Sequence, residues 1–378
     1  MAKIGDVCAS QIDTLSAAYN EKIDYIDISA VDNREKKITQ TAIVLAKDAP
    51  SRAKQLVEHG DVIVSLVRPN LNAVAIIEEQ SQNLQVASTG YCVLRCNQMI
   101  YNRYLFYFCQ SETFVNSMTA QATGASYPAV SNSIVKNCEI PLPERNKQKE
   151  IADILDKVTS LIFLRKQQIA KLDELVKAQF VEMFGDISNS RKVPMQDVCK
   201  IITDGTHQPP KFVLSGIPFL FVSNIVTNEI HYDAEKFISE ETYNELIKRT
   251  PIEVGDVLLS TVGSYGHPAV VKENKPFCFQ RHIAYLKPNH SVVNSEYLRC
   301  AILSTDLQRQ IDESVKGIAQ KTLNLSEIRK LRLPLPSLSL QNQFAAFVER
   351  IDQQKQTVQQ SLEKLELMKK ALMQEYFG

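Results

Sequence analysis

An apolar heptad pattern that occurs twice places the strongest constraint on the fold of this chain. Between Ile151 and Met183 apolar residues recur at alternating steps of four and three, and the pattern returns from Phe344 to Tyr376, displaced by 193 residues without a gap. Each copy follows a Pro-Leu-Pro segment and ends in Phe-Gly, which are start and stop signals for helices. So narrow a stripe on a helix of about 38 residues, or roughly 57 Å, needs a partner helix. We therefore predict two long helices that pair antiparallel with each other.

Polar residues interrupt the apolar stripe at four positions, namely Arg165, Gln179, Lys355 and Lys369. Arg165 corresponds to Val358 in the repeat and Lys355 to Ile162, so the polar residues need not face one another. Their long stems can lie along the seam. The alternative is a pair of unrelated surface helices, each packed on its own domain. The gap-free repeat argues against that alternative.

The segments before the two helices repeat the same order of short elements. A turn and strand at 60–65 return at 255–260, and a helix from Asn102, its expected N-cap, through Phe114 returns at 295–311. A chain of 378 residues has room for two or three domains. We predict an α+β fold with two pseudo-symmetric globular modules joined by long antiparallel helices that form a coiled-coil spacer. The modules are expected at 1–143 and 187–336, and the helices at 144–186 and 337–378.

The balance of charge excludes a strongly basic DNA-coating protein, because 43 Lys and Arg residues are matched by 43 Asp and Glu residues. Any binding of nucleic acid must use local patches or a basic partner. The eight cysteines show no disulfide or zinc spacing, and we expect Cys92 and Cys96 to pack in a core. No secretory leader and no apolar run of eighteen residues is present, so we expect a soluble, cytoplasmic protein without membrane association.

The sequence lacks the motifs of the common catalytic sites. The segment 208–211, Gln-Pro-Pro-Lys, comes nearest to the loop of DNA amino-methyltransferases, but it lacks both the leading Asn or Asp and the final aromatic residue. There is no phosphate-binding Gly-rich loop, no Gly-x-Ser-x-Gly elbow and no histidine pair with metal-ligand spacing. We therefore expect no catalytic residue and no metal site, and the duplicated scaffold favours a binding protein.

Polar loops carry the binding signal, because Arg, Asn, Gln, Ser and Thr are the side chains that contact base edges and phosphates. The candidates in the first module are Ser51, Arg52, Lys54, Arg68, Asn70, Ser88, Thr89, Thr123 and Ser126. Those in the second module are Thr206, His207, Ser264, Tyr265, Gln280, Arg281, His282, Gln320 and Lys321. For any single loop, an ordinary surface turn is the commoner interpretation. The strongest expectations for a DNA-facing side chain are Arg68 in the first module and Gln280 or Arg281 in the second.

The chain resembles the DNA specificity subunits of type I restriction–modification systems along its whole length. The resemblance rests on segments 49–53 and 60–69, on Asp204-Gly205-Thr206-His207, and on 255–260. Its most specific part is the order Pro-Leu-Pro, Gln, long helix and Phe-Gly, which occurs at both Gln148 and Gln341. No single motif decides the resemblance, which depends on their order and duplication.

The resemblance implies two target-recognition domains, each reading one half of a split, asymmetric DNA sequence, with the long helices as spacer. It implies that two copies of a separate methyltransferase subunit dock on the helices, bind S-adenosylmethionine and methylate adenine, and that motor-nuclease subunits join for cleavage. This chain would then need no cofactor of its own. Apolar residues off the seam are the expected partner-binding side chains, namely Leu161, Leu164, Leu175, Phe347 and Leu367. The alternatives are a coiled-coil adaptor without a DNA role and a fused methyltransferase or nuclease.

Overall fold

The computed structural model describes residues 1–78, 81–185, 192–317 and 321–378, which form two compact units. The first unit comprises Met1–Lys166 together with Gln360–Gly378, and the second comprises Gln167–Gln359. The division runs through the middle of the two long helices and not at their ends, where the sequence had placed the domain boundaries. Each unit is therefore a globular module completed by part of each long helix.

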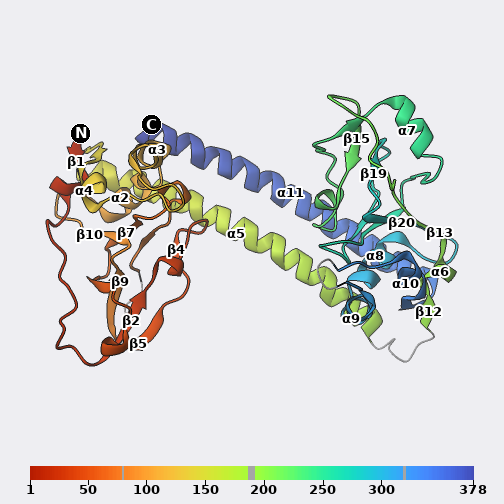
Figure 1. Cartoon of the computed structure of the whole chain (residues 1–378), viewed down its shortest axis with the longest axis horizontal. Helices are drawn as coiled ribbons and strands as arrows, with labels where there is room; N and C mark the ends of the chain where they lie inside the picture. Colours follow the sequence, from red (N-terminus) through yellow and green to blue (C-terminus); the bar gives the residue numbers. More distant parts are fainter. Residues whose placement is uncertain (79–80, 186–191, 318–320) are drawn as a thin grey trace. The chain divides into compact units, whose positions relative to one another are not determined.

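The two long helices are α5, Arg145–Phe184, and α11, Leu338–Phe377, each of 40 residues (Figure 1). Every apolar residue of the predicted seam is buried or half-buried. In the first unit the end of α11 packs on the core that holds the start of α5, through Leu372 and Tyr376. In the second unit the end of α5 packs against the start of α11, and the rings of Phe180 and Phe344 lie 5.5 Å apart. The helices run antiparallel in each unit, which confirms the prediction.

The four polar residues that interrupt the seam are half-buried, and the two lysines, Lys355 and Lys369, lie in different electrostatic surroundings. Lys355 forms ion pairs with Asp173 of α5 at 2.9 Å and with Glu229 at 3.4 Å. Lys369 has no carboxylate partner in the part of the chain that the structure describes, and its ammonium lies 5.9 Å from the ring centre of Tyr107. Burial, with a smaller contribution from Lys166, lowers the pKa of Lys369.

The first module is built from two sheets. A sheet in the order β5–β2–β9–β6 combines Ala42–Leu45, Lys22–Ile26, Leu84–Ser88 and Ala53–Leu56. A three-stranded sheet in the order β10–β7–β8 combines Tyr91–Leu94, Val62–Ser65 and Val74–Ile76. Short pairings join β1, Ala2–Lys3, to β11, Glu139–Ile140, and β3, Val31–Asp32, to β4, Lys37–Ile38. Figure 1 shows the small helices of this unit beside the start of α5 and the end of α11, with the larger sheet extending away from them.

The small helices of the first module are α1, Ile4–Val7, α2, Asn102–Phe108, α3, Glu112–Gln121, and α4, Asn132–Asn137. The single helix predicted from Asn102 through Phe114 is wrong, because Ser111 starts a second helix by accepting a hydrogen bond from the Phe114 amide at 3.2 Å. Asn102 is not the N-cap either. The helix begins after Tyr101, and the Asn102 side chain instead donates to the Gly60 carbonyl at 3.1 Å.

The second module repeats this plan with two four-stranded sheets. The order β13–β20–β17–β18 joins Cys199–Asp204, Ile283–Pro288, Val257–Ser260 and Pro268–Val270. The order β14–β16–β15–β19 joins Phe212–Val213, Phe237–Ile238, Ile217–Leu220 and Cys278–Phe279, and β12, Lys192–Pro194, pairs with β21, Arg332–Pro334. The small helices are α6, Met195–Val198, α7, Glu240–Leu246, α8, Ser295–Leu303, α9, Thr305–Ser314, and α10, Leu325–Lys330. Here too the helix predicted over 295–311 is two helices, because Ser304 caps α9.

A buried glutamine fixes the start of each long helix to its own module. Gln148 accepts from the Tyr101 amide at 2.8 Å and donates to the carbonyls of Met99 and Pro143. Gln341 makes the same three bonds, accepting from the Asn294 amide at 2.8 Å and donating to the carbonyls of Val292 and Pro336. Both glutamines are at most 1% exposed. Their polar atoms must therefore be satisfied inside the protein, and this requirement explains the glutamine in both copies.

The Phe-Gly end of each long helix completes the core of the other module. Phe377 packs against Tyr104 of α2, with ring centres 5.1 Å apart. Phe184 packs against Tyr297 of α8 at 4.9 Å. The residues that close the core of the first module thus come from the end of the chain, as the pseudo-symmetric prediction requires.

A buried carboxylate holds the turn before the central strand of each module. Asp61 accepts from the Glu58 amide at 2.9 Å and pairs with Arg95 at 2.9 Å. Asp256 accepts from the Glu253 amide at 2.8 Å and receives a hydrogen bond from the Tyr285 hydroxyl, also at 2.8 Å. These bonds position β7 and β17, whose far ends lead into the candidate loops. All eight cysteines are free; as expected, Cys92 lies in the core, and the half-buried Cys96 packs against it.

Candidate nucleic-acid interface

Backbone hydrogen bonds bring the four candidate loops of the first module to one edge of its sheets. The Thr89 amide donates to the Arg52 carbonyl at 2.9 Å, which joins loop 51–54 to loop 88–90. The Leu66 amide donates to the carbonyl of Gly90 at 2.8 Å, and the Arg68 amide donates to the carbonyl of Pro128 at 2.7 Å. Loops predicted independently from their composition therefore form one continuous surface.

The second module brings its loops together in the same way. The Arg281 amide donates to the backbone carbonyl of Thr206 at 3.0 Å, and the Thr261 amide donates to the backbone carbonyl of His282 at 2.9 Å. The Gly263 amide donates to Lys321 at 3.4 Å, so loops 203–207, 261–266, 280–282 and 321–322 are neighbours. Gln320 lies outside the described residues. Both modules thus carry a loop surface at the end of the equivalent strands β7 and β17.

The surface of the first module carries unpaired positive charge. Most of its candidates are exposed, namely Ser51, Arg52, Lys54, Arg68, Asn70, Thr89, Thr123 and Ser126. No described carboxylate forms an ion pair with the basic residues of this set. Cations left without partners are suited to DNA phosphates or base edges, because no internal ion pair must be broken to bind them.

Ser88 must be removed from the candidates. Its side chain is fully buried, and its hydroxyl accepts a hydrogen bond from the Gly90 amide at 3.3 Å. The residue lies opposite Ala53 of β6 and ends β9, a strand between β2 and β6 in which Val86 and Ala87 are also buried. Ser88 therefore shapes the turn and cannot reach a ligand.

The candidates of the second module differ in how much they are exposed. His207, Ser264, Arg281 and Lys321 are exposed, whereas Thr206, Tyr265, Gln280 and His282 are half-buried. The Tyr265 hydroxyl donates to Asp312 at 2.9 Å. Burial and the charge of Arg281 lower the pKa of His282, which favours its neutral form.

Asp204 holds two side chains, His207 and Arg249, in the second module. Its carboxylate contacts His207 Nε2 at 2.9 Å and the Arg249 guanidinium at 2.5 Å. Arg249 was not among the candidates, because it lies 45 residues from Asp204 and outside every polar loop. Gly205 is required here, since a Cβ atom would overlap the carbonyl oxygen atoms of Phe279 and Gln280.

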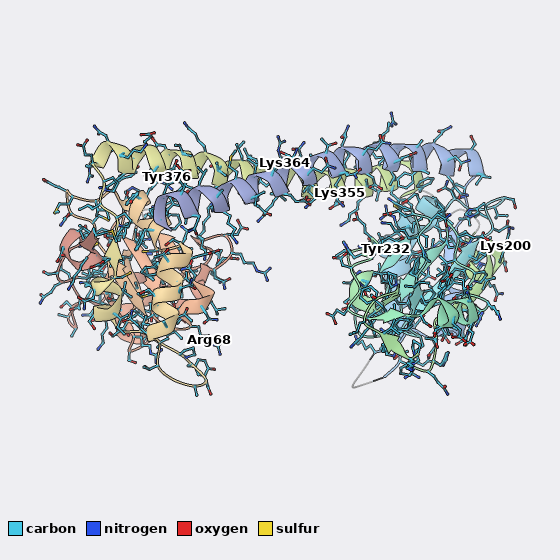
Figure 2. The ribbon with its side chains drawn as sticks, turned by 90° about the horizontal axis from the view of Figure 1, so that it is seen from above. Arg68, Lys200, Tyr232, Lys355, Lys364 and Tyr376 are labelled. Carbon is cyan, nitrogen blue, oxygen red and sulfur yellow. The ribbon has the colours of Figure 1, made fainter. Side chains whose placement is uncertain are left out.

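Arg68 of the first module stacks on Tyr127, which the sequence also did not single out. The guanidinium carbon lies 4.6 Å from the ring centre, and the Tyr127 side chain is 69% exposed. Figure 2 shows Arg68 on the side of its module that is opposite the long helices. The arrangement presents a flat, charged group to solvent.

The expected partner-binding residues of the helices are mostly exposed. Leu161, Leu164, Leu175 and Leu367 expose between 44% and 70% of their surface. Phe347 differs, because it is half-buried and packs against the core of the second module. It therefore offers little surface to a partner. None of the described helices combines the length and the apolar character needed to cross a membrane.

A family model described as "Type I restriction modification DNA specificity domain" matches residues 1–174 and again residues 188–367. The EcoBI specificity subunit of Escherichia coli is 22% identical over 290 residues, which are 69% of this chain and 61% of that protein. The chain thus spans less than two thirds of that relative. The MjaVIII specificity subunit of Methanocaldococcus jannaschii is 22% identical over 310 residues, or 76% of this chain and 72% of the relative.

Two solved structures share the fold over the whole chain. One comes from work on complex assembly and conformational transition of the type I R-M system, with 25% identity, a TM-score of 0.57 and 96% of its chain covered. The S subunit from M. genitalium has a TM-score of 0.61 at 14% identity, with 95% of its chain covered. Each match of the family model includes one module and most of the helix that follows it. The chain therefore belongs to the family of type I restriction–modification DNA specificity proteins.

Proposed function

We propose that this chain is the sequence-specific DNA-binding subunit of a type I restriction–modification complex. Each module reads one half of a split, asymmetric target with the loop surface at the end of β7 or β17. The observation that carries this proposal is the convergence of four polar loops in each module, with exposed Arg and Lys side chains that form no ion pair with a described carboxylate. Different residues on the two equivalent surfaces fit two different half-sites.

The test is to express the chain with its cognate methyltransferase subunit in a bacterial host that lacks DNA methylation. Sequencing the genomic DNA should reveal methylated adenines in a motif of two short half-sites separated by a non-specific gap. A mobility shift with mixed duplexes, with and without the methyltransferase subunit, should show sequence-specific binding. Methylation that does not depend on this chain, or a motif with one undivided site, would overturn the proposal.

The long helices act as the spacer between the two half-site readers. Insertion of seven residues, one heptad or roughly 10 Å, into the middle of both α5 and α11 keeps the alternating steps of the antiparallel seam. At about 3.4 Å per base pair, the gap in the methylated motif should grow by about three base pairs while both half-sites stay the same. A change in half-site sequence would count against the spacer role.

Two methyltransferase subunits dock on the helices and supply S-adenosylmethionine and the catalytic residues, and motor-nuclease subunits join them for cleavage. The exposed leucines of α5 and α11 support this assignment. The double variant Leu161→Ser and Leu164→Ser should lose the methyltransferase during co-purification, whereas Lys157→Ser on the same helix should retain it. Full retention by the leucine variant would exclude this contact. We place the complex in the cytoplasm, where the chromosomal DNA lies.

A further inference from the structure

Arg68 adopts a backbone conformation that favours glycine. Its φ angle is +49°, in the left-handed region, whereas the equivalent position in the second module is Gly263 with φ +72°. The equivalence is secured by the turn glycines that precede the two strands, Gly60 with φ +91° and Gly255 with φ +96°. It is secured further by the isolated bridges Val67–Ala129 and Val262–Thr322, which follow the strands. One module therefore uses the expected glycine, and the other holds an arginine in the same strained turn.

The neighbouring loop is also equivalent in the two modules and places an aromatic ring beside the arginine. Gly124 and Gly317 both have φ +106°, and the bridges Thr123–Ala129 and Lys316–Thr322 stand at equivalent positions of the two modules. In the first module this loop brings Tyr127 to 4.6 Å from the Arg68 guanidinium, while the Arg68 amide donates to Pro128 at 2.7 Å. The ring thus lies against the guanidinium, and the Arg68 side chain as a whole remains exposed.

Folding alone does not explain this arginine. The second module forms the same turn with glycine, so the turn does not need a side chain at this position. An exposed stack of Arg on Tyr contributes little to stability, and no described carboxylate forms an ion pair with Arg68. A strained residue with no structural benefit points to a function at this site.

We propose that Arg68 and Tyr127 form a pre-oriented pair that reads a guanine in the half-site of the first module. This assignment rests on the proposed DNA-binding function. The guanidinium edge can donate two hydrogen bonds to O6 and N7 of guanine in the major groove. Tyr127 is a positioning residue, because its ring holds the guanidinium plane before DNA binds and reduces the conformational freedom lost on binding.

The proposal is tested with Arg68→Gly, Tyr127→Ala and Tyr127→Phe in the full chain, co-expressed with the methyltransferase subunit in the methylation-free host. Arg68→Gly should relax one guanine position in one half-site, with a loss of preference of about 5- to 150-fold, and leave the other half-site unchanged. Its thermal midpoint should equal or exceed that of the native chain, because glycine relieves the strain. Tyr127→Ala should weaken the same position, whereas Tyr127→Phe, which keeps the ring, should not. Lys47→Ala, an exposed cation elsewhere in the same module, serves as the control.

An unchanged motif for Arg68→Gly, or relaxation at a position that is not a G·C pair, would overturn the inference. So would relaxation in both half-sites, or a lowered thermal midpoint that makes Arg68 a structural residue. If Tyr127→Ala and Arg68→Gly relax different base positions of the motif, the ring has no role in orienting Arg68. If the native chain directs no bipartite motif, the proposed function itself fails. This outcome is distinguishable from failure of the Arg68 assignment, because it is seen in the native chain and not only in the variants.

Discussion

Replacement of Gln341 by Leu should destabilise the second unit far more than a typical surface substitution. The glutamine is fully buried and makes three hydrogen bonds to backbone groups. Leucine fills a similar volume but leaves the Asn294 amide and two carbonyls without a partner. Leaving a buried polar group without its hydrogen-bond partner costs about 1–3 kcal/mol, and a carbonyl costs less than an amide. For one amide and two carbonyls we expect a loss of about 3–5 kcal/mol in the free energy of unfolding.

Hydrogen exchange can show where the loss occurs, because the two units can unfold separately and a single midpoint would not separate them. In Gln341→Leu the amides of α8, whose N-cap is Asn294, should lose protection, while α2 of the first unit keeps it. Gln148→Leu should give the reverse result. Gln343→Leu, an exposed position on the same helix as Gln341, should change the free energy by no more than about 0.5 kcal/mol. A loss of under about 1 kcal/mol in Gln341→Leu, or a loss of amide protection in the first unit, would contradict a structural role of the three hydrogen bonds.

Three other substitutions have outcomes that can be measured directly. Gly205→Ala should cost about 1–3 kcal/mol through overlap with neighbouring carbonyls and abolish recognition of the second half-site alone, as seen in the methylated motif. Lys369→Met should raise the free energy of unfolding by up to about 1 kcal/mol at pH 7, because the lowered pKa of Lys369 means that the folded state disfavours its charged form. This gain should shrink at alkaline pH, where the lysine of the native chain becomes neutral in the folded state. Chemical denaturation at pH 7 and pH 10 would test both statements. Phe377→Ala should cost about 3–5 kcal/mol and reduce exchange protection in α2, although the residue lies at the other end of the chain.

The long helices could be predicted from the sequence because a heptad pattern is a local signal repeated many times. The repeat of 193 residues then identified the two modules and their common loops. The breaks at Ser111 and Ser304 were missed, since the apolar pattern continues across each serine and only the cap hydrogen bond separates the helices. Propensity within a window cannot distinguish a polar residue on the surface from one that ends a helix.

The candidate interface could be predicted as a set of loops but not as a set of side chains. Composition identified polar turns, and the sheet then brought them together through backbone bonds. The burial of Ser88 depends on the position of β9 between β2 and β6, which a three-residue loop does not reveal. The contacts of Asp204 with Arg249 and of Arg68 with Tyr127 join residues 45 and 59 positions apart, so no local pattern indicates them. No residue near Arg68 in the sequence indicates its left-handed backbone conformation. The glycine at the equivalent position of the second module, Gly263, does indicate it.

The composite first unit has a consequence for how the nascent chain folds. Residues up to Lys166 leave the ribosome first, but Gln360 and the segment after it follow only about 200 residues later. At about 5–20 residues per second, the first module waits roughly 10–40 s for the helical segment that carries Phe377. During that interval the rings of Tyr104 and Phe108, which Phe377 covers in the finished protein, stay open to solvent and to chaperones. A premature stop before Gln360 would therefore damage the module that was synthesised first.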